Sequence, residues 1–166
     1  MPYLNVEDLA VYQKLCQLHI NVCDLTHQWP REETYELGSQ GRRASNSSPA
    51  QLAEKNDDRH VRNKIEGVNR SRGEAAETIH HLYIAKMKEY ISDANYMGFR
   101  ERYKQWIRML NGLEKKLEIK LPDSDRRWKH HDIPEPYKIN NSSHSFVRPP
   151  TPEPFDQSIS LHIRSD

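Results

Sequence analysis

Residues 7–29 read EDLAVYQKLCQLHINVCDLTHQW, and this stretch gives the clearest evidence for an all-α fold. Its apolar side chains recur at alternating spacings of four and three residues, which places them on one face of an α-helix. This core stripe comprises Val11, Leu15, Leu18, Val22, Leu25 and Trp29. The pattern predicts a helix from about Glu7 to Gln28.

A second apolar series lies beside the core stripe, about 100° further round the helix. This second stripe comprises Leu9, Tyr12, Cys16, Ile20 and Cys23. A helix that covers one core needs only one apolar stripe. Two neighbouring stripes therefore predict contact with several helices, or with a second subunit.

The next stretch with helical periodicity contains unusually small residues. Pro30 ends the first helix, because proline cannot supply the next backbone donor. The inward series of the second helix is Leu37, Gly41, Ala44, Ser48 and Leu52. Such a flat face allows another helix to approach closely. Pro49 interrupts the run, so we expect a kink or a break into two shorter pieces there.

Two further helices follow. The third begins after the capping residues Asn56-Asp57-Asp58 and reaches about Ile91. The fourth repeats the four-three alternation with Phe99, Tyr103, Trp106, Leu110, Leu113 and Leu117. Four amphipathic segments with short connections, and no competing strand pattern, predict an all-α fold. We expect an antiparallel up-down-up-down four-helix bundle over residues 1–120.

The character of the sequence changes after Lys120. Seven of the ten prolines lie between Pro122 and Pro154, and helical periodicity ends. Residues 121–166 are therefore predicted to form an irregular, proline-punctuated C-terminal tail. The candidate docking residues within this tail are Trp128, Tyr137 and Phe146.

Composition and cysteine usage narrow the class of protein. The net charge of +1 neither requires nor excludes a polyanionic partner. Cys16 and Cys23 are two helical turns apart, about 10 Å, which is too far for a disulfide within one helix. They indicate free thiols in a reducing compartment. No signal peptide or long apolar run appears, so we expect a cytoplasmic protein without a membrane span.

Glu77 and His80 form a Glu-x-x-His pair, the spacing used by carboxylate-bridged metal bundles. Such a site needs a second pair on another helix and further inward glutamates. Looser pairs occur at Asp24–His27 and Asp57–His60. The two pairs on the third helix are about 30 Å apart along it, and the fourth helix has no histidine. We expect no metal and no cofactor, with Glu77 in an interhelical hydrogen-bond network and His80 or His81 at the helix surface or a subunit contact.

No catalytic motif appears in the sequence. Ser45, Ser47 and Ser48 precede Pro49 without a glycine elbow or a base nearby in sequence, and serines before a proline commonly satisfy backbone groups at a kink. No glycine-rich phosphate loop is present. We therefore expect a protein that is not an enzyme.

Basic residues occur on both the second and the third helix. Seven of these cations are the candidates: Arg42, Arg43, Arg59, Arg62, Lys64, Arg70 and Arg72. They are candidates for binding nucleic-acid phosphates. The alternative is a solvated helix face, paired with Glu54, Glu66 and Glu74.

Several motifs occur in a recognisable order. They are Asp8-Leu9-x-Val11-Tyr12-Gln13-Lys14, Leu25-Thr26-x-x-Trp29-Pro30, Glu33-x-Tyr35-x-Leu37-x-x-Gln40-x-x-Arg43-Ala44, Arg72-Gly73-x-x-x-Glu77 and Met109-Leu110-Asn111-Gly112-Leu113-Glu114-Lys115-Lys116-Leu117. Through them the chain, from about Asn5 to Lys120, resembles the four-helix bundle proteins encoded in intervening sequences of bacterial 23S rRNA genes. Their superfamily includes the Avd-like accessory variability determinants of diversity-generating retroelements. The resemblance implies an up-down bundle and a homopentamer, and its retroelement branch implies binding of nucleic acid and a reverse transcriptase. Because Arg43 belongs to one of these motifs, the resemblance also implies a structural role for it within the bundle.

The expectation is a non-enzymatic, homo-oligomeric and pentameric helical scaffold. Its partner would be RNA, DNA or a nucleic-acid enzyme such as a reverse transcriptase. The first alternative is a protein-interaction adaptor without nucleic-acid binding, with the tail as its contact. The second is a metal-binding bundle enzyme.

Overall fold

The structure, a computed structural model, describes residues 5–126 and is built from four long α-helices. They are α1 (Ala10–Thr26), α3 (Leu37–Asn56), α4 (Val61–Met87) and α5 (Asp93–Glu118). The short helix α2 (Arg31–Tyr35) connects α1 to α3, and two single 3₁₀ turns are η1 (Val6–Asp8) and η2 (Asp123–Asp125). Residues 5–126 contain no strand, so the prediction of an all-α fold is confirmed.

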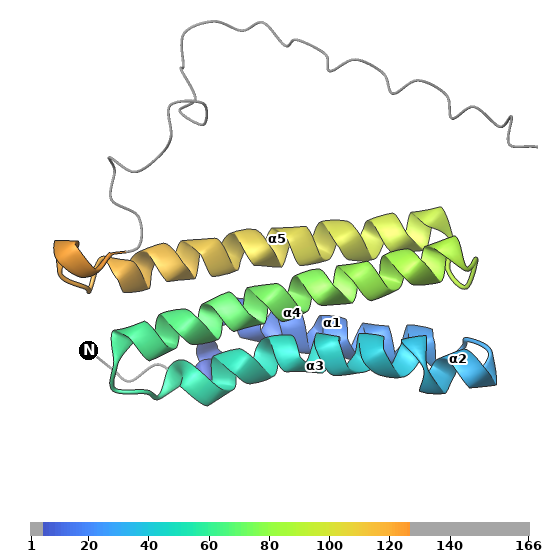
Figure 1. Cartoon of the computed structure of the whole chain (residues 1–166), viewed down its shortest axis with the longest axis horizontal. Helices are drawn as coiled ribbons and strands as arrows, with labels where there is room; N and C mark the ends of the chain where they lie inside the picture. Colours follow the sequence, from blue (N-terminus) through green and yellow to red (C-terminus); the bar gives the residue numbers. More distant parts are fainter. Residues whose placement is uncertain (1–4, 127–166) are drawn as a thin grey trace, which may run out of the picture. The chain divides into compact units, whose positions relative to one another are not determined.

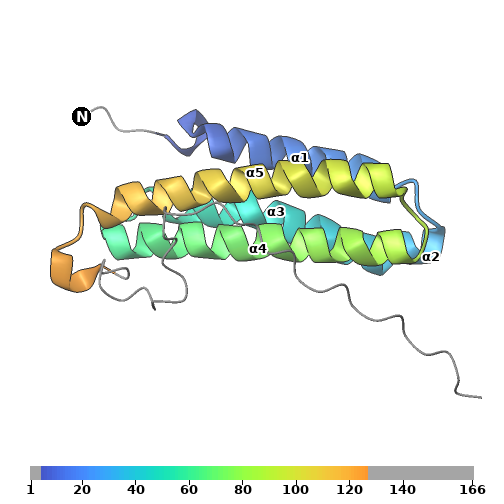
Figure 2. The same ribbon diagram turned by 90° about the horizontal axis from the view of Figure 1, so that it is seen from above.

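The four long helices run alternately in opposite directions (Figures 1 and 2). α3 packs against α1 and α4, and α5 packs against α4 and α1, so each long helix has two neighbours. The helices therefore enclose one common core. This arrangement is the antiparallel up-down-up-down four-helix bundle that the sequence predicts.

The core stripe of α1 forms the first wall of this core. Val11, Leu15, Leu18 and Val22 are at most 5% exposed, and Trp29 stacks against Tyr90 with 6.0 Å between ring centroids. The opposite walls include Val68 and Leu82 of α4, and Phe99, Tyr103 and Leu110 of α5. Each large apolar side chain buried in this way contributes about 1.5–3 kcal/mol. The prediction of one continuous inward stripe is confirmed.

Small residues let α3 and α4 approach closely, as predicted. Ser48 Oγ donates to the backbone oxygen of Ser71 at 2.9 Å, and both serines are fully buried. A Cβ atom at Gly67 would lie 2.6 Å from Lys55 Cβ and 2.9 Å from the backbone oxygen of Gln51. Only glycine fits this position without moving α3.

The expected break of the second helix into two shorter pieces at Pro49 is wrong, and a kink there stays a prediction. α3 is continuous from Leu37 to Asn56, and Pro49 is buried inside it. The proline removes one helical donor, but a 20-residue helix packed against both α1 and α4 keeps its remaining bonds and contacts. The interruption lies instead at Glu36, whose φ of −93° and ψ of −99° separate α2 from α3.

The turn between α4 and α5 begins earlier than predicted, because α4 ends at Met87 rather than near Ile91. Glu89 adopts a left-handed conformation with φ of 61°. The Tyr90 N–H donates to the Ala85 oxygen and the Glu89 N–H to the Lys86 oxygen, both at 2.9 Å. These two bonds form the Schellman motif that closes helix ends.

The described chain continues a short way past Lys120. Arg126 Nε lies 3.2 Å from the backbone oxygens of both Glu118 and Leu121, and Asp125 pairs with Arg62 at 2.7 Å. The rest of the predicted tail lies outside the described residues, including Trp128, Tyr137 and Phe146. The domain boundary at Lys120 therefore stays a prediction.

Candidate nucleic-acid interface

Two of the seven predicted cations hold the bundle together. Arg72 donates to Asn111 Oδ1 at 2.6 Å and to Glu114 Oε2 at 2.7 Å, which joins α4 to α5. Arg42 donates to Thr26 Oγ1 at 3.0 Å and to the Thr34 backbone oxygen at 2.8 Å. Both guanidinium groups are committed to contacts between helices.

Three further candidates have local partners. Lys64 Nζ donates to the Asn56 backbone oxygen at 2.6 Å, near the C-terminal end of α3. Arg62 pairs with Asp125 at 2.7 Å, and Arg70 pairs with Glu66 one helical turn earlier at 2.5 Å. The last two cations are more than half exposed, and exposed ion pairs of this kind are weak.

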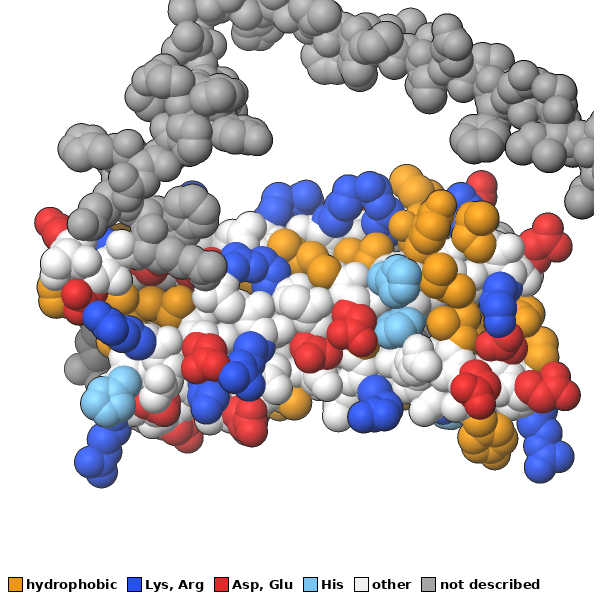
Figure 3. All heavy atoms as spheres, in the orientation of Figure 1, with side chains coloured by type: hydrophobic (Ala, Val, Ile, Leu, Met, Phe, Trp, Pro, Cys, Tyr) orange, Lys and Arg blue, Asp and Glu red, His pale blue; other side chains and the backbone are white. Residues whose placement is uncertain are grey.

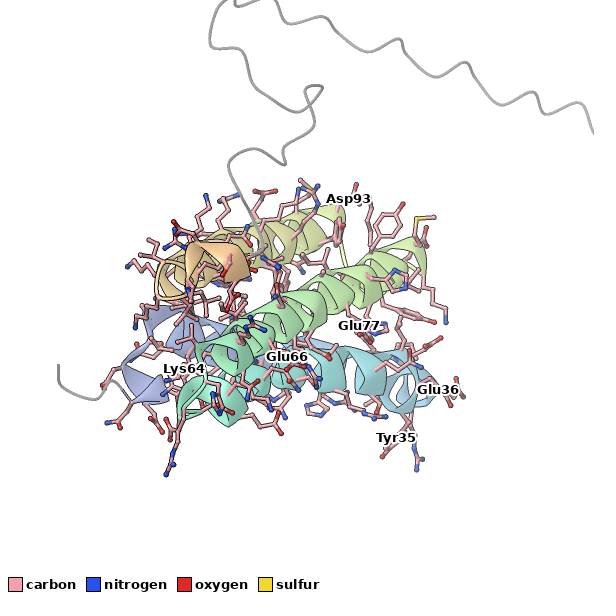
Figure 4. The ribbon with its side chains drawn as sticks, turned by 60° about the vertical axis from the view of Figure 1, so that its left-hand side comes forward. Tyr35, Glu36, Lys64, Glu66, Glu77 and Asp93 are labelled. Atoms are coloured by element: carbon pink, nitrogen blue, oxygen red, sulfur yellow. The ribbon has the colours of Figure 1, made fainter. Side chains whose placement is uncertain are left out.

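The remaining two candidates, Arg43 and Arg59, are exposed and form no hydrogen bond or ion pair with residues 5–126. Arg43 lies in the first half of α3. Arg59 lies beyond the opposite end of α3, just before α4, so the two residues are roughly 20 Å apart along the axis of α3. Figure 4 shows Lys64 and Glu66 near the start of α4, with Glu77 further along the same helix. The structure therefore does not gather the seven candidates on one surface, and their binding role stays a prediction.

A basic surface that the sequence analysis missed lies on α5. After Glu101, the exposed or half-exposed charged residues of this helix are all cations. We call these residues the α5 basic face: Arg102, Lys104, Arg108, Lys115 and Lys116. Lys and Arg side chains gather along the edge that α5 forms in Figure 3.

The α5 basic face is positive because its neighbouring carboxylates are buried. Glu114 and Glu118 are 6% and 7% exposed, and Glu114 accepts the hydrogen bond from Arg72. Nearer the start of α5, Asp93 and Glu101 are each paired with a cation, at 2.9 Å and 3.0 Å. Exposed negative charge is thus absent from the surface of α5 after Glu101.

Four of the five cations of the α5 basic face are free. Lys104, Arg108, Lys115 and Lys116 have no hydrogen bond or ion pair with the described chain. Arg102 is held locally, since its Nε donates to the Gly98 oxygen at 3.2 Å and its guanidinium lies 4.7 Å from the Phe99 ring centroid. The four free cations can therefore contact anions without breaking an existing bond.

Glu77 and His80 do not pair with each other. The partner of Glu77 is His81 of the same helix, whose Nε2 lies 3.4 Å from Glu77 Oε1 and which is 8% exposed, so the expected interhelical network is wrong. His80 is exposed, and its ring centroid lies 5.5 Å from that of His81. Between residues 5 and 126, no three His, Cys, Asp or Glu side chains are placed to hold a metal ion.

A polar cluster between α1 and α3 also escaped the sequence analysis. His19 Nδ1 lies 2.8 Å from Ser45 Oγ, which itself donates to the Arg42 backbone oxygen at 2.9 Å. His19 is therefore the donor to Ser45, and the serine is not activated as a nucleophile. Burial lowers the pKa of His19 and raises the pKa of the Cys23 thiol, 3.7 Å from the His19 ring. Both shifts favour neutral, structural side chains.

The geometry defines a class of protein: an antiparallel four-helix bundle with a cationic outer surface on its last helix. The model of the family described as 23S rRNA-intervening sequence protein matches residues 7–112, from η1 into α5. The chain therefore belongs to the 23S rRNA-intervening sequence protein family. A search of curated proteins found no match. In the described chain, no helix is both long and apolar enough to cross a membrane.

Proposed function

We propose that this protein is a non-enzymatic scaffold that binds nucleic acid through the α5 basic face. The observation that supports the proposal most is the burial of Glu114 and Glu118, which leaves cations as the only exposed charged residues of α5 after Glu101. Cations that contact phosphates release condensed counterions, and this release drives binding that depends little on base sequence. The free side chains of Lys104, Arg108 and Lys115 are suited to such contacts.

The proposed scaffold is a homo-oligomer assembled through the second stripe of α1. Within residues 5–126, Ile20 is 52% exposed, and Tyr12, Cys16 and Cys23 are only half-buried. Covering these side chains in an assembly would remove apolar surface from water. The subunit number of five rests on the family resemblance. A ring would repeat the α5 basic face and convert weak phosphate contacts into strong overall binding.

The proposed location is the cytoplasm. Cys16 and Cys23 are both free thiols, as expected for a protein in a reducing compartment.

The test is a filter-binding titration of the full-length protein with RNA and DNA at low salt. Wild-type protein should retain both. The variant Lys104→Gln/Arg108→Gln/Lys115→Gln should bind at least about tenfold more weakly, because three phosphate contacts are lost. A matched control, Arg59→Gln/Arg62→Gln/Arg70→Gln, removes the same charge from the earlier candidates and should bind nearly as well as wild type.

Two results would overturn this assignment. A larger loss in the Arg59/Arg62/Arg70 variant would move the interface to the start of α4. No retention of any RNA or DNA would reject nucleic-acid binding. It would favour the protein-interaction adaptor instead, with an enzyme such as a reverse transcriptase as its partner.

A further inference from the structure

The α5 basic face contains no exposed aromatic side chain. Tyr96, Phe99 and Tyr103 are at most 8% exposed, and Trp106 packs against the core beneath Lys14, whose Nζ lies 6.0 Å from its ring centroid. The exposed aromatic residues of the described chain, Tyr35 and Tyr83, belong to α2 and α4. Proteins that bind single strands stack bases on exposed aromatic rings, at about 1–3 kcal/mol per base. This face lacks those platforms.

Three cations of this face form a straight row along α5. At 100° and 1.5 Å per residue, Lys104, Arg108 and Lys115 lie within a sector of about 40° and span about 17 Å of the helix axis. A duplex presents one phosphate per about 1.7 Å of its axis, fixed in position by base pairing. A row of cations carried by one rigid helix matches phosphates held in fixed positions, whereas a flexible strand must first be ordered.

The packing of α5 also keeps it out of a groove. A free helix, about 10–12 Å across, fits the B-DNA major groove, which is about 12 Å wide. α5 instead packs against α4 on one side and α1 on the other, as Figure 2 shows, so only its outer surface is available. Side chains on that surface reach backbone phosphates rather than base edges.

We infer that the ligand of the α5 basic face is duplex nucleic acid, held by its phosphate backbone without base readout. This inference rests on the nucleic-acid binding proposed above. The feature recognised is the pair of phosphate backbones, which duplex RNA and duplex DNA have in common.

The inference is tested by fluorescence anisotropy with the full-length protein at one low salt concentration. The probes are an RNA duplex, a DNA duplex of the same sequence, a DNA duplex of scrambled sequence, and a thymidine homopolymer strand, each about 20 nucleotides or base pairs long. The duplexes should bind about tenfold or more tightly than the strand, and scrambling should leave affinity unchanged. Comparable binding of RNA and DNA duplexes supports backbone recognition, and a preference for one identifies the helix form that is bound.

Two variants connect this preference to the surface. Lys104→Gln/Arg108→Gln/Lys115→Gln should remove most of the difference between duplex and strand, whereas Arg59→Gln/Arg62→Gln/Arg70→Gln should preserve it. Circular dichroism establishes that both variants are folded. A strand that binds as tightly as the duplexes would overturn the inference and leave nucleic-acid binding intact. Failure of every probe to bind would overturn the proposed function, and this inference with it.

Discussion

Gly67 shows how one residue sets the distance between two helices. Any Cβ there would meet both the Lys55 side chain and the Gln51 backbone, and backbone cannot rotate away. We expect Gly67→Ala to lower the free energy of unfolding by about 2 kcal/mol, within the usual range for an overpacked core. Gly98→Ala is the matched control, since it lies in open space on α5 and should gain about 0.5–1 kcal/mol in helix propensity. Urea denaturation measures both, and equal effects would contradict the packing argument.

His19 makes the stability of the bundle depend on pH. Because burial lowers the pKa of His19, the unfolded chain takes up a proton at a higher pH than the folded chain does. The contribution of His19 to the free energy of unfolding should therefore be fully present above the ordinary histidine pKa of about 6.5. It should be lost as the pH falls through the lower pKa that His19 has in the folded protein. His19→Gln should flatten this part of the pH profile, and His80→Gln, at an exposed site, should not. A His19→Gln profile parallel to wild type would refute this role.

The difference between Arg72 and its neighbour Arg70 is visible only in three dimensions. Both were predicted as phosphate ligands because both are basic and near each other in sequence. Arg72 holds the buried Glu114, whereas Arg70 pairs with an exposed glutamate of its own helix. Residue type and spacing in the sequence do not show which cations already form ion pairs within the folded protein.

The link between α4 and α5 depends on that Arg72–Glu114 pair. Arg72→Ala would leave a buried carboxylate without its cation and should cost about 2 kcal/mol, less than for a fully buried pair since Arg72 is 30% exposed. Arg70→Ala removes an exposed ion pair and should change stability by no more than about 0.5 kcal/mol. Thermal unfolding of the two variants provides the comparison. Equal destabilisation would show that Arg72 has no special role.

At the level of elements, the sequence predicted the four long helices, because the four-three spacing depends on one physical requirement, burial of an apolar stripe. It misplaced the interruption of the second helix. Pro49 is a strong local signal for a break, but packing against two neighbouring helices outweighs it, and Glu36 carries no comparable signal. Local propensity is a weak guide where tertiary contacts are extensive.

The C-terminal part of the α5 basic face was missed because the sequence around Lys115 and Lys116 is balanced in charge. The stretch LEKKLE, residues 113–118, contains two glutamates and two lysines and suggests a neutral surface. Glu114 and Glu118 follow Leu110 at spacings of four, so they fall on the buried side of α5 while the lysines do not. A helical wheel would have revealed this separation, whereas counting charges within residues 113–118 does not.

For the whole molecule, the second stripe of α1 predicts how copies assemble. Ile20→Lys places a charge at its most exposed apolar position and should dissociate the oligomer without reducing helix content. Met97→Lys, at a similarly exposed position on α5, is the control and should leave assembly unchanged. Light scattering gives the mass of each species. Wild-type protein that is monomeric at micromolar concentration would contradict the oligomer.

The salt dependence of nucleic-acid binding tests the central claim most directly, because the slope counts the phosphates that the protein neutralises. The logarithm of the binding constant for a DNA duplex is measured against the logarithm of salt concentration, for wild type and for Lys104→Gln/Arg108→Gln/Lys115→Gln. At about 0.9 per phosphate, loss of three contacts should make the slope shallower by about 2.7 per protein chain engaged. An unchanged slope and affinity would show that the α5 basic face does not contact the nucleic acid.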